Sequence, residues 1–431
     1  MAFEISILLF IMLLFFITGV PIAFVLTAVG ITGILFQRGV PGLYQFALHF
    51  WEGGSNFIYI CIPLFIFMAI TMERGKTGKL IFDVAAKWLQ RLPGGLGIST
   101  IGASALFAAL SGTSVATAAT VGLVAYPEMS ARGYPKKITL GALSAGGGLG
   151  MLIPPSVPLI VYGALTGESI GQLFIAGIIP GLLMAFLYCL LIAIRAWRGD
   201  IQEKEESSTW REKFSSVKAA FWGLLLIPIV IGGLYLGFFT PTEAGAVGMV
   251  LSLVVVVVIY RTLKIREIPA ILRDTLRVTI MIFFLLLGAS LFNYVMSLYQ
   301  IPAIVTDWVL HLDMSPLGII IMLNLIFLIL GCFVDAVSLM VIALPLAYPV
   351  ITTLGYSGVW FGIVLMVNIN MAVETPPVGL NLYVLKGIAK DITLSDVIMG
   401  VIPFYICEVT GLIIVILFPF LSLWLPSLMG G

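Results

Sequence analysis

Charged side chains are scarce in this sequence, and their scarcity excludes several classes of protein. Only 10% of the 431 residues are charged, and 22 Lys and Arg are balanced by 21 Asp and Glu. A soluble globular domain carries about 25% charged residues, so a soluble fold is excluded. The net charge of +1 provides no extended basic surface, so we expect no nucleic-acid partner and no polybasic membrane anchor.

Residue patterns of common metal and nucleotide sites are also missing. The two histidines, His49 and His311, lie far apart, and the four cysteines form no C-x-x-C pair. We therefore expect no zinc site and no other transition-metal site. The segment RGKTGK (74–79) lacks the upstream glycine of a phosphate-binding loop. We expect neither ATP hydrolysis, nor another enzymatic activity, nor a bound organic cofactor.

Apolar runs of about 20 residues recur along the whole chain, which is 61% hydrophobic. They predict an all-α polytopic membrane protein whose N-terminus is a retained helix rather than a cleaved signal peptide. The first run contains Pro21 and is too long for one straight crossing, so we expect it to be tilted, kinked or subdivided. Helical spans are predicted at 5–36, 56–72, 140–164, 170–194, 219–239, 243–260, 278–298, 358–385 and 396–424.

The distribution of basic residues predicts the topology. Lys and Arg are concentrated in four connectors, which are 73–93, 129–139, 195–218 and 261–277. They are absent from 299–314 and 351–357. The positive-inside rule places the basic connectors in the cytoplasm. The tract 94–128 then starts and ends inside, and 315–350 starts and ends outside, so each is predicted to be a re-entrant hairpin. The N-terminus is predicted to be cytoplasmic and the C-terminus periplasmic.

An internal repeat relates the two halves of the chain. AYPEMSARGY (125–134) matches AYPVITTLGY (347–356) at five of ten positions, and the proline pair at 154–155 recurs at 376–377 with the same offset. Because the two hairpins enter from opposite sides, the repeat is predicted to have inverted topology. Inverted repeats with interrupted helices at corresponding positions are typical of secondary transporters, whose binding site lies near the membrane midplane.

Each repeat interrupts one of its own helices. The segment GGGLGMLIPPS (146–156) combines residues that cost about 1 kcal/mol (Gly) and about 3 kcal/mol (Pro) in a helix interior. Backbone groups freed inside a bilayer must be satisfied by protein, water or ligand. Freed carbonyls suit Na⁺, and a new helix N-terminus suits a carboxylate. The interruptions therefore predict binding sites for a cation and an organic anion.

Two acidic residues, Asp335 and Glu374, fall within the predicted membrane region. A carboxylate there costs about 2.5–3.5 kcal/mol even on the insertion scale, so it indicates a function by default. The alternative is a structural partner that fixes a hairpin tip. The small hydroxyl residues of the tips and interruptions are either ligands or helix-packing groups. Glu243, which follows Thr240 and Pro241, is predicted to cap a helix.

Three motifs resemble one transporter family. ALSGTSVATAATVG (109–122), GGGLGMLIPPS (146–156) and NINMAVETPPVGLNLYV (368–384) are similar to the DctM family, the large membrane subunits of tripartite ATP-independent periplasmic (TRAP) transporters. The resemblance covers nearly the whole chain. It implies an ion-transporter-superfamily fold with an elevator-type mobile domain, in the bacterial inner membrane. It further implies Na⁺-coupled uptake of an organic acid, such as a C4-dicarboxylate, sialic acid or another sugar acid.

The resemblance also implies two protein partners and a division of the chain. The partners are a small four-helix membrane subunit of the DctQ type, expected as a separate chain, and a periplasmic substrate-binding protein of the DctP type. Segments 1–55 and 195–277 would form the scaffold. The first repeat would span 56–194, with hairpin 94–128 and interrupted helix 140–164. The second would span 278–431, with hairpin 315–350 and interrupted helix 358–385.

The family pattern assigns candidate site residues. The first Na⁺ site would comprise Ser111, Gly112, Thr113, Gly148 and Gly150. The second would comprise Val334, Asp335, Asn370, Glu374, Thr375 and Gly379. The substrate would contact Ser114, Pro154, Pro155, Ser156, Asp335 and Thr375.

Three other functions are weighed against Na⁺-driven transport. A proton-coupled carrier would use Asp335 or Glu374 as its proton site. A channel needs a continuous pore, often between symmetric subunits, whereas two opposed hairpins favour alternating access. An intramembrane enzyme would need a catalytic pair, which the sequence does not offer.

Overall fold

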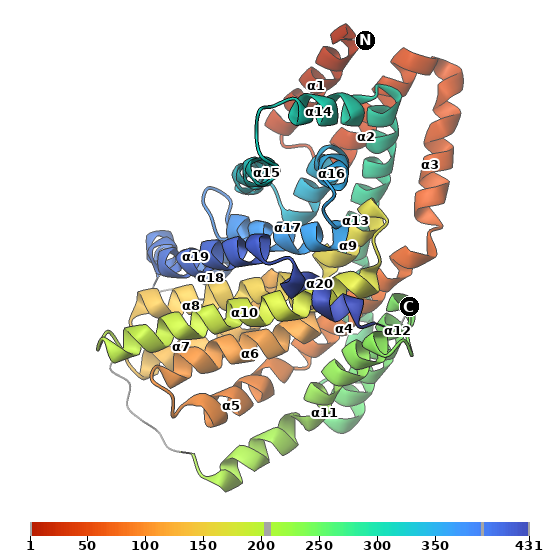
Figure 1. Ribbon diagram of the computed structural model, residues 1–431. Coiled ribbons are helices and arrows are strands. Elements are labelled where there is room, and N and C mark those ends of the chain that lie inside the picture. Colours follow the sequence, from red (N-terminus) through yellow and green to blue (C-terminus); the bar gives the residue numbers. More distant parts are fainter. Residues whose placement is uncertain (1, 202–207, 389–391, 430–431) are drawn as a thin grey trace.

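The computed structural model describes residues 2–201, 208–388 and 392–429. Within these ranges the chain is helical and contains no strand. Seven of the described helices are long and apolar enough to cross a membrane, and several shorter apolar helices accompany them. The predicted all-α polytopic membrane architecture is therefore confirmed, and Figure 1 shows its arrangement.

The N-terminal apolar run is divided into two helices. They are α1 (Ala2–Ile17) and α2 (Ile22–Arg38), and Pro21, with its fixed backbone angle, directly precedes α2. The predicted single tract 5–36 is thus subdivided. A 3₁₀ turn (Val40–Leu43) and α3 (Tyr44–Gly54) follow. No residue of α3 is buried against the described part of the chain.

The next part of the chain contains the first hairpin and the first interrupted helix. Its elements are a 3₁₀ turn (Phe57–Ile60), α4 (Cys61–Arg74), α5 (Thr77–Leu89), α6 (Gly95–Ser111), α7 (Ser114–Ala131), α8 (Lys136–Gly148), a 3₁₀ turn (Leu149–Met151), α9 (Val157–Thr166) and α10 (Ile170–Trp197). Two helices then separate this part from the second half. They are α11 (Trp210–Tyr235) and α12 (Pro241–Leu253), the latter continued by a π-helical segment (Val254–Ile259) and followed by a 3₁₀ turn (Ile265–Glu267).

The second half repeats the order of elements. It contains α13 (Ile268–Leu298), α14 (Ile301–Leu310), α15 (Pro316–Gly331), α16 (Ala336–Thr353), α17 (Gly358–Val373), α18 (Leu380–Ile388), α19 (Leu394–Leu417) and α20 (Phe420–Ser427). The spacing of the repeat is visible in the helix starts. For example, α7 begins at Ser114 and α16 at Ala336, and these starts have the same offset as the two proline pairs.

Sequence reasoning missed helices in the connectors. It assigned loops to 73–93 and 299–314, where the structure has α5 and α14. Helix α5 is amphipathic: Ile81, Phe82 and Ala85 are buried, whereas Lys79 is exposed. The basic residues from which this connector was predicted to be cytoplasmic lie on a helix, and they lowered its hydropathy so that the helix was not predicted.

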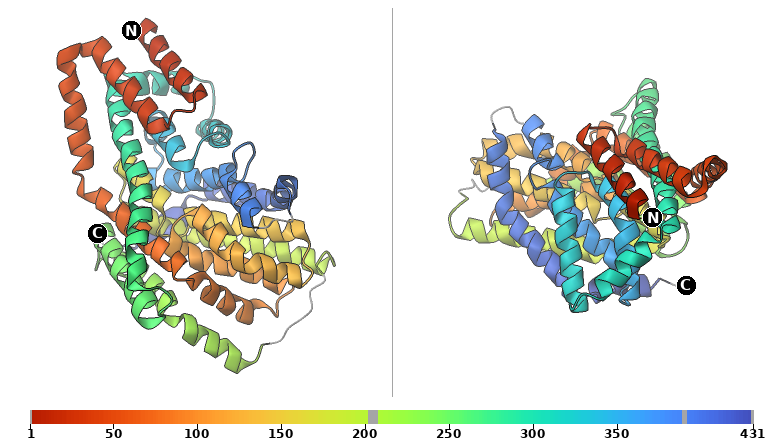
Figure 2. Two further views of the ribbon diagram at one scale, coloured as in Figure 1. Left: turned by 180° about the vertical axis from the view of Figure 1, so that it is seen from behind. Right: turned by 90° about the horizontal axis from the view of Figure 1, so that it is seen from above.

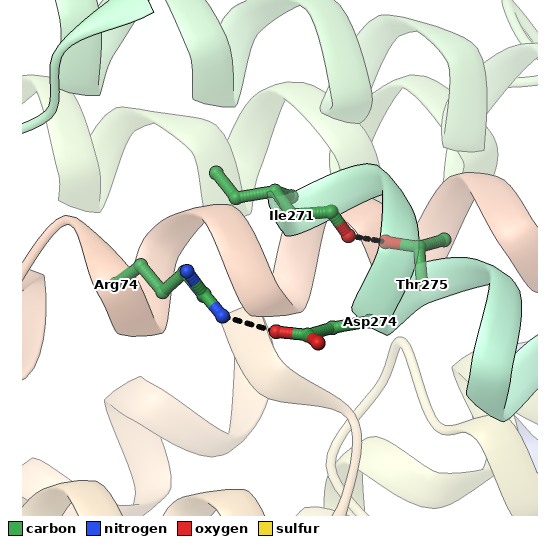
Figure 3. A network of polar contacts seen from close by, with 4 residues as sticks. All are labelled: Arg74, Ile271, Asp274 and Thr275. Atoms are coloured by element: carbon green, nitrogen blue, oxygen red, sulfur yellow. Dashed lines mark hydrogen bonds and ion pairs between the residues drawn. The ribbon is translucent and has the colours of Figure 1, made fainter. Parts of the chain in front are cut away.

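The start of α13 was predicted too late, at 278 instead of Ile268. The added turns carry Arg273 and Arg277 on exposed faces, so hydropathy alone excluded them. Here Asp274 pairs with Arg74 at the end of α4, and the Thr275 hydroxyl donates to the Ile271 carbonyl at 2.8 Å (Figure 3). The ion pair fastens α4 to α13.

Helix α12 begins with a capping box, as predicted for Glu243. Thr240 caps the helix, and the Glu243 carboxylate accepts a hydrogen bond from the Thr240 backbone N–H at 2.9 Å. The interaction satisfies backbone donors that a helix start leaves free.

Helices of the two halves pack across each other. Helix α7 packs on α18, and its counterpart α16 packs on α9. Helix α8 packs on α19, and α10 packs on α17, so these helices form one interleaved group (Figure 1). The long α13 runs along one side of the molecule and packs on α2 (Figure 2, left). Helices α1, α2 and α13 share a second, smaller hydrophobic core.

Candidate functional site

The tip of the first hairpin lies directly against the first interrupted helix. Helix α6 ends at Ser111, and Gly112 reverses the chain with φ of +61° before α7 starts at Ser114. The backbone N–H of Val157, which starts α9, donates to the Gly112 carbonyl at 3.0 Å. A Cβ at residue 112 would lie 2.3 Å from the Pro155 carbonyl oxygen. Only glycine fits this junction.

Four members of the predicted first ion site come together at this tip, which are Ser111, Gly112, Thr113 and Gly150. The Ser111 hydroxyl lies 2.6 Å from the Thr117 hydroxyl, which donates to the Thr113 carbonyl at 2.8 Å. A Cβ on Gly150 would lie 2.5 Å from that same carbonyl oxygen. Thr117 was missed by sequence reasoning, although it lies one helical turn after Thr113. The fifth member, Gly148, lies away from the tip, where a Cβ on it would be 1.9 Å from the Asn370 side-chain oxygen.

The second hairpin repeats this arrangement. Helix α15 ends at Gly331 and α16 starts at Ala336. After the proline pair 376–377, the Val378 N–H donates to the Cys332 carbonyl at 3.1 Å. Both Pro–Pro bonds, at 154–155 and 376–377, are cis. In each half, then, the segment that follows the proline pair is hydrogen-bonded to a hairpin tip.

Asp335 is the N-cap of α16. One carboxylate oxygen accepts the backbone N–H groups of Val337 at 3.0 Å and Ser338 at 3.1 Å, and the other accepts the Ser338 hydroxyl. Asp335 and Val334 also line a cavity of about 720 Å³ between this tip and helices α1, α2 and α13. The cap holds the carboxylate at the edge of a cavity between the two hydrophobic cores.

The other predicted substrate contacts do not reach this cavity. Ser114 is buried and bonded to the Asn381 side chain at 2.7 Å. Ser156 is fully buried, caps α9 and donates to the Met151 carbonyl at 2.7 Å. Pro154 and Pro155 are also buried, and the Thr375 hydroxyl donates to the Met371 carbonyl at 2.7 Å. The structure thus places only Asp335 of this set at the cavity.

Two predicted ion-site residues, Asn370 and Glu374, point into the interior instead of to the second tip. The Asn370 amide donates to the Glu408 carboxylate at 2.8 Å, and the Tyr188 hydroxyl donates to the same oxygen at 2.9 Å. The Glu374 carboxyl group lies close enough to the Glu408 carboxyl group for their charges to interact. Gly379, with φ of +42°, lies after the proline pair and packs on the Thr375 carbonyl. Sequence reasoning missed Glu408, although an acid within the apolar span 396–424 meets the criterion that selected Glu374.

Comparison with known proteins decides the family. The family described as "Tripartite ATP-independent periplasmic transporter, DctM component" matches residues 9–421. The chain belongs to the DctM family. This agrees with the resemblance in the three sequence motifs.

Curated relatives support the family assignment, and a solved structure shows a similar fold. The C4-dicarboxylate TRAP transporter large permease protein DctM of Pseudomonas aeruginosa is 37% identical over 384 residues, covering 89% of this chain and 90% of that protein. The sialic acid TRAP transporter large permease protein SiaM of Vibrio cholerae is 32% identical over 418 residues, covering 96% of each. The crystal structure of the Alcanivorax borkumensis YdaH transporter has a similar fold, with a TM-score of 0.65 at 14% identity, over 96% of this chain and 97% of that one.

These findings define the general role of the protein. As a DctM-family member, it is a large permease subunit of a TRAP transporter and a multi-pass membrane protein. Its relatives are transporter permeases rather than enzymes.

Proposed function

We propose that this permease imports an organic acid together with Na⁺ by an elevator movement of the interleaved helices. The observation that carries the proposal is the pairing of each hairpin tip with an interrupted helix, through Val157 to Gly112 and Val378 to Cys332. Two such junctions, related by the repeat, place irregular backbone inside the apolar protein, as in secondary transporters.

The first junction offers oxygen atoms to a cation. The Thr113 carbonyl and the hydroxyls of Ser111 and Thr117 lie within hydrogen-bond distance of one another. Gly150 brings the interrupted helix against the Thr113 carbonyl. Oxygen ligands from carbonyls and hydroxyls suit a hard cation such as Na⁺, and a coordinated ion would join the tip to the interrupted helix. The second coupling ion is proposed at the tip around Val334, Asp335 and Gly379.

The cavity beside Asp335 supports the elevator mechanism. It lies between the second hairpin tip and helices α1, α2 and α13, which share their own hydrophobic core. A substrate held at this boundary would travel when the interleaved helices slide past the α1–α2–α13 group.

The substrate class and partners are proposed from the relatives. Their names include transporters for C4-dicarboxylate, sialic acid and 2,3-diketo-L-gulonate, which are organic acids. The relative of Oleidesulfovibrio alaskensis is named permease protein DctMQ, and this chain spans 61% of its length. We propose that the permease works with a DctQ-type small subunit and a periplasmic DctP-type binding protein, in the inner membrane.

Uptake into proteoliposomes tests the proposal. The permease, its small subunit and its binding protein would be supplied with a panel of radiolabelled organic acids under an imposed Na⁺ gradient. We expect uptake of one acid class that requires the binding protein, increases with external Na⁺ and shows a Hill coefficient above one. Uptake that persists without Na⁺ and follows a pH gradient would favour proton coupling through Asp335 or Glu374 instead.

A further inference from the structure

A cavity of about 340 Å³ lies between α8, α10 and α19, at one end of the interleaved helices. These helices pack on one another (Figure 1). The buried side chains of Ile192 and Phe404 line the cavity, together with Met399 and Ile402, which are 46% and 49% exposed. No described residue of either hairpin tip lines it. The cavity is therefore separate from the site described above.

The basic residues of the cavity lie at the helix ends, and its apolar residues lie deeper. Helix α8 begins at Lys136 and α10 ends at Trp197, so Lys137 and Arg195 each lie within one turn of a helix end. Phe404 lies ten residues after Leu394, the start of α19, which is about 15 Å along the helix axis. The cavity thus has a charged mouth at a helix end and an apolar interior towards the middle of the membrane.

The same end carries a marker of the membrane surface. Trp197, at the end of α10, is 72% exposed, and exposed tryptophans are concentrated where membrane and water meet. The basic connectors 129–139 and 195–218 adjoin this end, which is the one predicted to be cytoplasmic. The mouth of the cavity therefore lies at the level of the lipid headgroups.

The carboxylates near the mouth leave its basic groups able to bind an anion. Arg195 donates to Asp200 at 3.0 Å, but both side chains are about 40% exposed and the guanidinium has five N–H donors. Asp396 is close enough to Lys137 for their charges to interact. Its carboxylate is held by the cap of α19, where it accepts the Thr393 backbone N–H at 2.9 Å and the Thr393 hydroxyl at 2.8 Å.

We propose that the cavity binds an anionic phospholipid of the cytoplasmic leaflet. Its phosphate would contact Lys137 and Arg195, and an acyl chain would lie between α10 and α19 along Ile192 and Phe404. Basic pockets between membrane helices on the cytoplasmic side bind anionic headgroups in this way, and the planar guanidinium of Arg matches the geometry of a phosphate.

The dimensions and the lining favour a lipid over other occupants. One turn of an α-helix is about 5.4 Å long and about 10 Å across, so it fills roughly 420 Å³, more than the whole cavity. A partner helix therefore cannot enter it. A free phosphate ion would contact only the mouth and would leave the apolar interior without a ligand.

A lipid bound here would join the two halves of the chain. Helices α8 and α10 belong to the first half and α19 to the second. Because the lipid contacts all three, its binding should stabilise their packing and raise the temperature of unfolding.

Lipid binding and thermal unfolding of the delipidated, full-length permease in detergent test the inference. Native mass spectrometry would count the lipids bound in titrations with phosphatidylglycerol or phosphatidylethanolamine of equal acyl chains. The unfolding midpoint would be measured with each lipid and with inorganic phosphate. The test variant is Lys137→Gln/Arg195→Gln. The matched control is Arg273→Gln/Arg277→Gln, which removes two exposed basic residues from the predicted cytoplasmic end of α13.

We expect the wild type and the control to bind one phosphatidylglycerol more tightly than phosphatidylethanolamine. The test variant should bind it roughly 30-fold more weakly, because each basic residue near an anionic lipid contributes about a factor of five. It should also lose the rise in unfolding midpoint that phosphatidylglycerol causes. Ile402→Asn, which places a polar group on the apolar wall, should weaken binding of the same lipid while leaving both basic residues in place.

Three results would overturn the inference. They are an unchanged affinity of the test variant for phosphatidylglycerol, an equal loss of affinity in the control, and an equal rise in midpoint with inorganic phosphate. The last would show that the site recognises a free anion instead of a lipid. If the double variant does not fold, Lys137→Gln alone, at an exposed position, should still lower the affinity about five-fold. An unchanged affinity there would be equally decisive against the site.

Discussion

The junction between the first hairpin tip and the first interrupted helix can be tested with two glycines that share one backbone conformation. Gly112 has φ of +61° and Gly133 has φ of +79°, and both follow a helix end. A Cβ at residue 112 would lie 2.3 Å from the Pro155 carbonyl oxygen, whereas a Cβ at residue 133 meets no described atom within 4 Å. Gly133→Ala therefore measures the conformational cost alone, and Gly112→Ala adds the cost of separating the junction.

The size of each effect follows from the structure. An alanine in the left-handed region costs about 1–2 kcal/mol, which is the full expected effect of Gly133→Ala. Gly112→Ala must also displace Pro155 and so lose the hydrogen bond from Val157 to the residue 112 carbonyl. Leaving these buried groups unpaired costs about 1–3 kcal/mol more. We expect Gly112→Ala to destabilise the protein by about 2–5 kcal/mol in total.

Thermal unfolding in detergent, followed by size-exclusion chromatography, measures the difference, and uptake into proteoliposomes measures its functional consequence. We expect Gly133→Ala to unfold slightly earlier than the wild type and to transport normally. Gly112→Ala should unfold at a clearly lower temperature and lose transport. Equal midpoints and normal transport in both variants would refute the direct contact between tip and interrupted helix.

Asp335→Asn keeps the shape of the helix cap but removes its charge. We expect this variant to insert into the membrane but to lose most or all uptake. Normal transport by an unstable, aggregating variant would instead show that Asp335 has a structural role. Thr117→Ala removes one of the hydroxyls proposed as ion ligands at the first tip, and its uptake should need more Na⁺ but keep a comparable maximum rate. Loss of protein rather than a shift in Na⁺ dependence would argue against an ion role. The predicted topology can be tested by labelling single-cysteine variants with a membrane-impermeant thiol reagent. Cysteines at Lys79 and Arg132 should be labelled only from the cytoplasm, and one at Ser357 only from the periplasm. Labelling of positions 79 and 132 from opposite faces would contradict the re-entrant hairpin.

Local chemistry predicted much of the helical framework. The helix interruptions at 149–156 and 374–379 follow from glycine and proline, whose backbone preferences act within a few residues. The same is true of the division at Pro21 and of the capping box at Glu243. The constant offset between the two halves was readable because the matching prolines, glycines and tyrosines recur in register. Amphipathic α5 was missed because a window that counts charge cannot recognise a helix with one buried face. Helix α14 was missed because its ten residues are too few for a membrane span.

The contacts that decide how the candidate site works were determined by tertiary packing. Neither sequence distance nor residue type places Tyr188 on the distant Glu408, or separates buried Ser114 and Ser156 from the cavity beside Asp335. The sequence alone established that the chain crosses the membrane, interrupts two helices and repeats itself, because hydropathy, glycine, proline and basic residues act locally. Only the folded structure decided which buried oxygens face one another, because that depends on how α8, α10, α17 and α19 pack, and so on contacts between residues distant in the chain.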